Sequence, residues 1–149
     1  MERQRILLAD DNAEIRERIG SLLQSHFDVV ASVETGQQTI ESAIALNPDI
    51  LVLDISMPIF NGIEVASRLK DSSCRAKLIF LTVHEDGAAF SLGAFGYVLK
   101  RSVDSDLIPA LQGALEGRTF ASVFPARHRG DGTRSGVKAA RVDGLDLPS

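Results

Sequence analysis

Residues 50–58 read Ile50-Leu51-Val52-Leu53-Asp54-Ile55-Ser56-Met57-Pro58. Four consecutive apolar residues bounded by turn formers predict a strand that is buried on both faces. Such strands are typical of parallel sheets covered by helices on both sides. The strand ends at Asp54, so we expect this carboxylate at the carboxyl edge of the sheet, where open α/β folds bind their ligands.

Short apolar strands alternate with amphipathic helices on both sides of this stretch. We expect strands at residues 6–9, 29–31, 50–54, 78–81 and 97–99, and helices at about 13–25, 37–46, 62–70, 86–92 and from 104–106 to Gly117. In the second helix, Ile40, Ala43 and Ile44 are expected on the buried face. Pro109 should lie in or near the first turn of the last helix, or at a kink. This alternation predicts an α/β fold with a doubly wound, five-stranded parallel sheet and helices on both faces.

The composition is that of one globular domain with a tail. With 149 residues, of which 44% are hydrophobic, the chain can bury a core. No apolar run approaches the roughly 18 residues of a membrane span, and the first residues lack the apolar stretch of a secretory signal, so we expect a cytoplasmic protein. A net charge of −4 argues against general nucleic-acid binding by the folded part. The single Cys74 excludes an internal disulfide.

Five polar side chains follow or end the expected strands. Asp10 and Asp11 come after the first strand, Asp54 ends the third, and Thr82 and Lys100 come after the fourth and fifth. Right-handed crossovers bring the carboxyl ends of parallel strands to one edge, so these side chains are expected together. Each residue alone is typical of a solvated loop, and the joint placement is what indicates a site.

The chemistry that suits this set is phosphoryl transfer. Three carboxylates in one crevice repel one another unless a cation neutralises them, and hard oxygen ligands suit Mg²⁺. Asp54 is the candidate nucleophile, whose carboxylate would carry an acyl phosphate. Lys100 would supply a positive charge, and Thr82 a hydroxyl donor, to the phosphoryl oxygens.

Four motifs carry a family resemblance. They are Leu8-Ala9-Asp10-Asp11-Asn12, Leu53-Asp54-Ile55-Ser56-Met57-Pro58-Ile59-Phe60-Asn61-Gly62, Leu81-Thr82 and Gly96-Tyr97-Val98-Leu99-Lys100. Over about residues 5–120 the chain resembles the receiver domain of bacterial two-component response regulators, in detail those receivers that precede a helix-turn-helix output domain. The resemblance implies a flavodoxin-like fold of receiver type at residues 1–122. Residues 123–149 are polar and glycine-rich, so we expect a disordered tail without an output domain.

The resemblance also implies a phosphate-accepting metal site. Asp54 would accept a phosphoryl group from a phosphohistidine on a sensor histidine kinase or phosphotransfer protein. Asp11, Asp54 and the backbone carbonyl of Ser56 would ligate Mg²⁺, with Asp10 acting mainly through a metal-bound water. Lys100 would pair with the phosphoryl oxygens.

Switching and tuning residues are implied in the same way. Thr82 would move toward the new phosphoryl group, and Tyr97 would change rotamer into the space vacated. Ser56 and His84 lie where the family tunes autodephosphorylation.

The sequence departs from the family in the segment that leads to Lys100. Arg101 stands where many receivers have a proline, so the usual cis bond is not expected. Thr82 and Lys100 are closer than the family norm by roughly four residues, about one helical turn. The missing turn falls near residues 86–88, so the fourth helix is expected to be shortened.

We expect a stand-alone receiver that signals by phosphorylation-dependent binding to a downstream protein or by phosphorelay. It would be no enzyme beyond its own phosphorylation and autodephosphorylation. The alternative is a decoupled receiver that serves as a constitutive binding module or phosphate sink. Neither membrane association nor nucleic-acid binding is expected, and homodimerisation stays open.

Two enzyme classes fit the motifs less well. A Mg²⁺-dependent phosphatase with an aspartyl nucleophile commonly carries Asp-x-Asp after its first strand, whereas Asp10 and Asp11 are adjacent here. A dinucleotide-binding enzyme would need Gly-x-Gly in the turn after the first strand, and that turn has no glycine pair.

Overall fold

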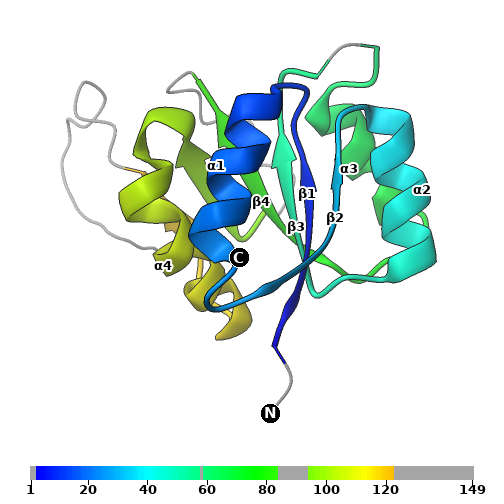
Figure 1. The fold of residues 1–149 in the computed structure, drawn as a ribbon. Helices are drawn as coiled ribbons and strands as arrows, with labels where there is room; N and C mark the ends of the chain where they lie inside the picture. Colours follow the sequence, from blue (N-terminus) through cyan, green and yellow to red (C-terminus); the bar gives the residue numbers. More distant parts are fainter. Residues whose placement is uncertain (1–2, 58, 84–93, 123–149) are drawn as a thin grey trace, which may run out of the picture.

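A parallel sheet in the order β2-β1-β3-β4-β5-β6 runs through the part of the chain that the structure describes. This computed structural model describes residues 3–57, 59–83 and 94–122. The strands are β1 (Arg5–Ala9), β2 (Asp28–Val33), β3 (Ile50–Asp54), β4 (Lys77–Thr82), β5 (Gly96–Leu99) and β6 (Phe120–Ala121). The helices are α1 (Ala13–Leu23), α2 (Gly36–Leu46), α3 (Gly62–Lys70) and α4 (Val103–Leu115), with a 3₁₀ turn η2 (Lys100–Ser102) before α4. Figure 1 shows α1 and α4 on one face of the sheet and α2 and α3 on the other, which confirms the doubly wound α/β fold.

The buried strand β3 supplies both layers of the core. All five of its residues are buried. Ile50 and Val52 pack in the cluster on the α1 and α4 side, whereas Leu51 and Leu53 pack in the cluster on the α2 and α3 side. Successive side chains of a strand point to opposite faces, so a strand placed between two helical layers needs an uninterrupted apolar run.

The sheet has six strands, so the prediction of five is wrong by one. In the pairing of β6 with β5, the Phe120 N–H donates to the Phe95 carbonyl at 2.9 Å. The Ser122 N–H donates to the Tyr97 carbonyl, also at 2.9 Å. A strand of two residues carries no hydrophobic periodicity, and backbone bonds rather than side chains define it. Tyr97 is therefore on an interior strand and is 1% exposed.

Two further expectations about helices are corrected. Ile44 is 49% exposed, whereas Ala43 is buried as expected and Ile40 is partly buried against the core; α2 also buries Gly36 and Thr39. The last helix begins at Val103, before the expected start at 104–106, so Pro109 lies in its second turn, near the first. A proline there cannot donate the backbone bond that this position would otherwise make.

Several sequence-based expectations fall outside the described residues. They concern Pro58, His84, the short helix at 86–92 with its missing turn, and the tail at 123–149. These expectations, and the receiver boundary at 122, stay predictions. Across the described ranges, no helix combines the length and the hydropathy needed to cross a bilayer.

The turn between β3 and α3 holds the end of β3 close to the start of the helix. The Gly62 N–H donates to the Ile55 carbonyl at 2.8 Å. A Cβ on Gly62 would lie 2.4 Å from the Asp54 carbonyl oxygen and 2.8 Å from the Ile55 Cα. By contrast, a Cβ on Gly20 of α1 would meet nothing within 4 Å. The backbone that carries Asp54 therefore depends on the absence of a side chain at position 62.

We predict that Gly62→Ala lowers the free energy of unfolding by about 2 kcal/mol, because the new methyl group must displace backbone. Gly20→Ala is the matched control, and it should raise the free energy of unfolding by about 0.5 kcal/mol because alanine favours the helix. Urea denaturation of the three proteins checks both values. Equal effects of the two substitutions would contradict the close approach at Gly62.

Candidate functional site

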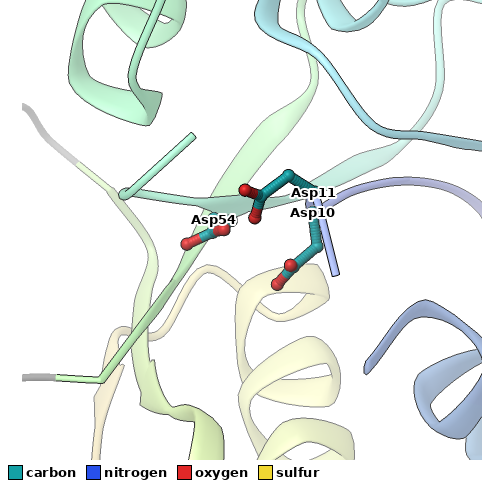
Figure 2. A group of neighbouring side chains, drawn as sticks. All are labelled: Asp10, Asp11 and Asp54. Carbon is teal, nitrogen blue, oxygen red and sulfur yellow. The ribbon is translucent and has the colours of Figure 1, made fainter. Parts of the chain in front are cut away.

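Three carboxylates gather at the carboxyl edge of the sheet (Figure 2). Asp10 and Asp11 come from the turn after β1, and Asp54 is the last residue of β3. Each offers an oxygen within 4.8 Å of the others. Asp10 is 0% exposed and Asp54 is 1% exposed, whereas Asp11 is exposed. Two acids are thus inside the protein and the third lies at the opening of the site.

Backbone donors orient the two buried carboxylates. Asp10 Oδ1 accepts the Asn12 N–H at 2.9 Å, and Asp54 Oδ1 accepts the Ser56 N–H at 3.0 Å. Asn12 itself caps α1, because its side chain accepts the N–H groups of Glu14 and Ile15. In each buried acid one oxygen is therefore held by its own turn.

The other oxygen of each buried acid meets Lys100. Its Nζ lies 2.9 Å from Asp10 Oδ2 and 3.1 Å from Asp54 Oδ2. Neither Oδ2 has a hydrogen bond of regular geometry to a described residue, so this ion pairing is their compensation. Lys100 is the first residue of η2, directly after β5. One ammonium is shared by two buried carboxylates, which leaves the site short of positive charge.

Burial and the shared cation act on the pKa values in opposite directions. Burial raises the pKa of the Asp54 carboxyl to about 6, and the Asp10 charge adds to this, while the Ser56 N–H and Lys100 oppose it. Burial works to lower the pKa of the Lys100 ammonium, but Asp10 and Asp54 outweigh it and the pKa is raised. Lys100 is therefore charged at neutral pH. Ionisation of the Asp54 carboxyl costs free energy, because the charged form is buried.

The donor set fits a divalent cation. Carboxylate oxygens are the ligands that Mg²⁺ prefers, and the cluster combines an exposed acid with two buried oxygens that lack regular hydrogen bonds. Asp10, Asp11 and Asp54 are the residues that would hold the ion. The backbone carbonyl of Ser56, in the turn after Asp54, stays a predicted ligand.

Thr82 lies on β4, which pairs with β3, and Tyr97 lies on β5, the strand beyond β4. Asp54 is level with Leu81 in the β3–β4 pairing, so Thr82 is the next residue along the edge. Thr82 is level with Leu99 in the β4–β5 pairing, directly before Lys100. Thr82 is 3% exposed. The structure thus brings Thr82 to the same edge as Asp54 and Lys100, with Tyr97 buried two residues before Leu99.

Arg16, which no sequence pattern singled out, supports the acidic turn. Arg16 Nη1 donates to the Asp10 backbone carbonyl at 2.7 Å, and Arg16 Nη2 lies 3.8 Å from Glu34. Arg16 comes one turn after the helix cap, where an arginine is ordinarily a solvated residue. No local pattern distinguishes it from Arg18 on the same helix, so its role was not readable from the sequence.

Comparisons with known proteins agree with this geometry. A family model described as the response regulator receiver domain matches residues 6–112. The chain is 36% identical over 113 residues to the transcriptional regulatory protein LnrK of Bacillus subtilis, covering 72% of this chain and 51% of LnrK. It is 36% identical over 123 residues to the nitrate/nitrite response regulator NarL of Escherichia coli K12, covering 78% of this chain and 57% of NarL. The match therefore spans little more than half the length of these relatives.

A solved structure gives the same result for the fold. A two-component response regulator of the LuxR family from Aurantimonas superposes with a TM-score of 0.74 at 30% identity. The superposition covers 80% of this chain and 89% of that structure. The names of these relatives agree with the resemblance found in the sequence.

We predict that Asp54→Asn stabilises the protein at pH 7 by about 1 kcal/mol when Mg²⁺ is chelated, a value reduced for solvent screening. The native Asp54 keeps its proton up to a pH of about 6, above the usual 3.8 of an unfolded chain. Wild-type stability should therefore fall as the pH rises through about 4 to 6, and the variant should lack this fall.

Urea denaturation across this pH range in EDTA measures the difference. The exposed Asp28→Asn is the control, and it should track wild type. A variant that is less stable than wild type at pH 7, or an advantage that grows on acidification, would refute the prediction.

Proposed function

The chain belongs to the response regulator receiver domain family, and on this premise we propose that it accepts a phosphoryl group on Asp54. The donor is a phosphohistidine of a sensor histidine kinase or phosphotransfer protein. The observation that carries the proposal is the position of Asp54, which is buried at the sheet edge with one oxygen fixed by the Ser56 N–H and the other facing Lys100.

The Asp54 carboxylate acts as the nucleophile. An oxygen of the ionised carboxylate attacks phosphorus, the new O–P bond forms as the N–P bond to the donor breaks, and the departing imidazole takes up a proton. Lys100 stabilises the charge on the transferring oxygens, and it is already placed 3.1 Å from Asp54 Oδ2. The Thr82 hydroxyl is proposed to donate to a second phosphoryl oxygen.

We assign Mg²⁺ as the cofactor, held by Asp10, Asp11 and Asp54. When bound, Mg²⁺ supplies positive charge that offsets the three carboxylates and the incoming phosphoryl oxygens. The cluster alone has one ammonium for two buried acids, which supports this requirement. Ser56 and His84 are proposed to tune autodephosphorylation.

The signal is proposed to pass through strands β4 and β5. Thr82 and Leu99 are paired neighbours, so a movement of Thr82 bears directly on the strand that carries Tyr97. The chain would then act in the cytoplasm through a downstream protein or a phosphorelay, as a signalling domain rather than an enzyme. The alternative is a phosphate sink, in which the added charge does not change the β4–β5 region.

An exposed residue beside the site supports recognition by another protein. Ile59 is 94% exposed, in the loop between Asp54 and α3. Its φ of 69° lies in the left-handed region, which costs a β-branched residue about 1–2 kcal/mol. An exposed apolar side chain held in this way, in the loop that follows Asp54, is suited to contact the phosphodonor protein.

We predict that acetyl phosphate with Mg²⁺ adds one labile phosphoryl group to the wild-type protein, as seen by intact mass. Asp54→Asn should give no adduct, because the nucleophile is gone, and EDTA should abolish the reaction. Lys100→Ala should slow it by about 100-fold, since it removes the cation that faces the transferring group. Lys70→Ala, at the exposed end of α3, is the matched lysine control and should react like wild type.

Hydrogen exchange on the phosphorylated protein separates the switch from the sink. Altered protection of β4, β5 and the start of α4 is expected for a switch, and an adduct without it identifies a sink. A wild-type protein that takes no phosphoryl group from acetyl phosphate or from a kinase would disprove the role assigned to Asp54.

A further inference from the structure

Ser122 closes the edge of the strand that leads to Lys100. Its Oγ accepts the Leu99 N–H at 3.0 Å, and its N–H donates to the Tyr97 carbonyl at 2.9 Å. Ser122 is 3% exposed, so both bonds are shielded from water. β6 ends at Ala121, and the serine side chain thus continues the pairing of β5 by one further bond.

A charged acceptor orients the Ser122 hydroxyl. The Ser122 O–H donates to Asp106 Oδ2 at 2.7 Å. Asp106 is in the first turn of α4, where a negative charge is favoured by the helix dipole. Because the hydroxyl proton is directed to Asp106, a lone pair of the same oxygen is left to face the Leu99 N–H.

This chain of bonds ends one residue before Lys100. The backbone turns sharply at that point, because Leu99 closes β5 and Lys100 opens η2. From there the Lys100 side chain must place its Nζ between two carboxylates, 2.9 Å and 3.1 Å away. The Leu99 N–H belongs to the Val98–Leu99 peptide, so a change in the direction of that peptide would pass through Leu99 to Lys100 and move the ammonium off one of the two acids.

We propose that Ser122, oriented by Asp106, is a positioning residue for Lys100 in the phosphoryl transfer. It touches neither the phosphoryl group nor the carboxylates, and it acts through the Leu99 backbone. This inference rests on the proposed function, since Lys100 matters in this way only if Asp54 is phosphorylated.

The test compares Ser122→Ala with the conservative Ser122→Thr and with Thr39→Ala. Thr39 is the matched control, because it is 0% exposed and its hydroxyl donates to the Thr35 carbonyl at 2.7 Å in α2, away from Lys100. Ser122→Ala should slow phosphorylation by acetyl phosphate at saturating Mg²⁺ by about tenfold, as expected for a misplaced catalytic group. Ser122→Thr should restore the rate, and Thr39→Ala should react like wild type even if it unfolds more easily.

Two readouts separate positioning from a general loosening of the fold. In the Lys100→Ala background, Ser122→Ala should cause no further loss of rate, because the residue through which it acts is gone. Mg²⁺ affinity, measured by calorimetry without phosphodonor, should be no weaker in Ser122→Ala than in wild type, because the three acids stay in place.

The outcomes also distinguish this inference from the function on which it rests. If wild type is phosphorylated but Ser122→Ala reacts equally fast, Ser122 does not position Lys100. The same conclusion follows if its effect adds in full to that of Lys100→Ala, or if its Mg²⁺ affinity falls. If wild type takes no phosphoryl group, the proposed function itself fails, and the inference fails with it.

Discussion

The site depends on one ammonium that is shared by two buried carboxylates. Asp10 and Asp54 are almost fully inaccessible, and charged groups in such a position are stable only when they are paired. Lys100 meets this need from η2, directly after β5, so β1, β3 and β5 must end at the same level. The positive charge is still insufficient for three acids. The cluster is therefore suited to a further cation, and under the proposed function that cation would offset the charge of the incoming phosphoryl group.

The packing of the sheet makes this sharing possible. β3 lies between two helical layers and contributes alternate residues to each, which fixes the position of its carboxyl end. Gly62 then allows α3 to start directly against that end, so the turn after Asp54 has little freedom. Because interiors are packed at the density of organic crystals, a small shift of β3 would be felt in both layers. The positions of the site's side chains are thus fixed by apolar contacts in the core, away from the carboxylates and Lys100.

Most of the fold, and the meeting of Asp10, Asp11, Asp54 and Lys100 at one edge, could be predicted from the sequence, because both follow from patterns that extend over several residues. The uninterrupted apolar run of β3 and the helical spacing of α1 and α3 are signals of this kind. β6 was missed because two residues carry no period. The exposure of Ile44 was not predicted, because it depends on which part of α2 the neighbouring helices and strands cover. The role of Arg16 depends on a carbonyl that faces it only after folding. The contacts of such single residues could therefore be identified only from the three-dimensional structure.

The direction of β6 has a practical consequence for handling the protein. β6 runs parallel to β5, so the chain leaves the sheet on the side of the three carboxylates. β1 runs in the same direction, and its first residue, Arg5, therefore lies at the opposite edge. An affinity tag or a surface anchor joined before Arg5 keeps clear of the acidic edge. A large fusion placed soon after Ser122 would be tethered beside that edge, where it would compete for space with any protein that approaches the three carboxylates.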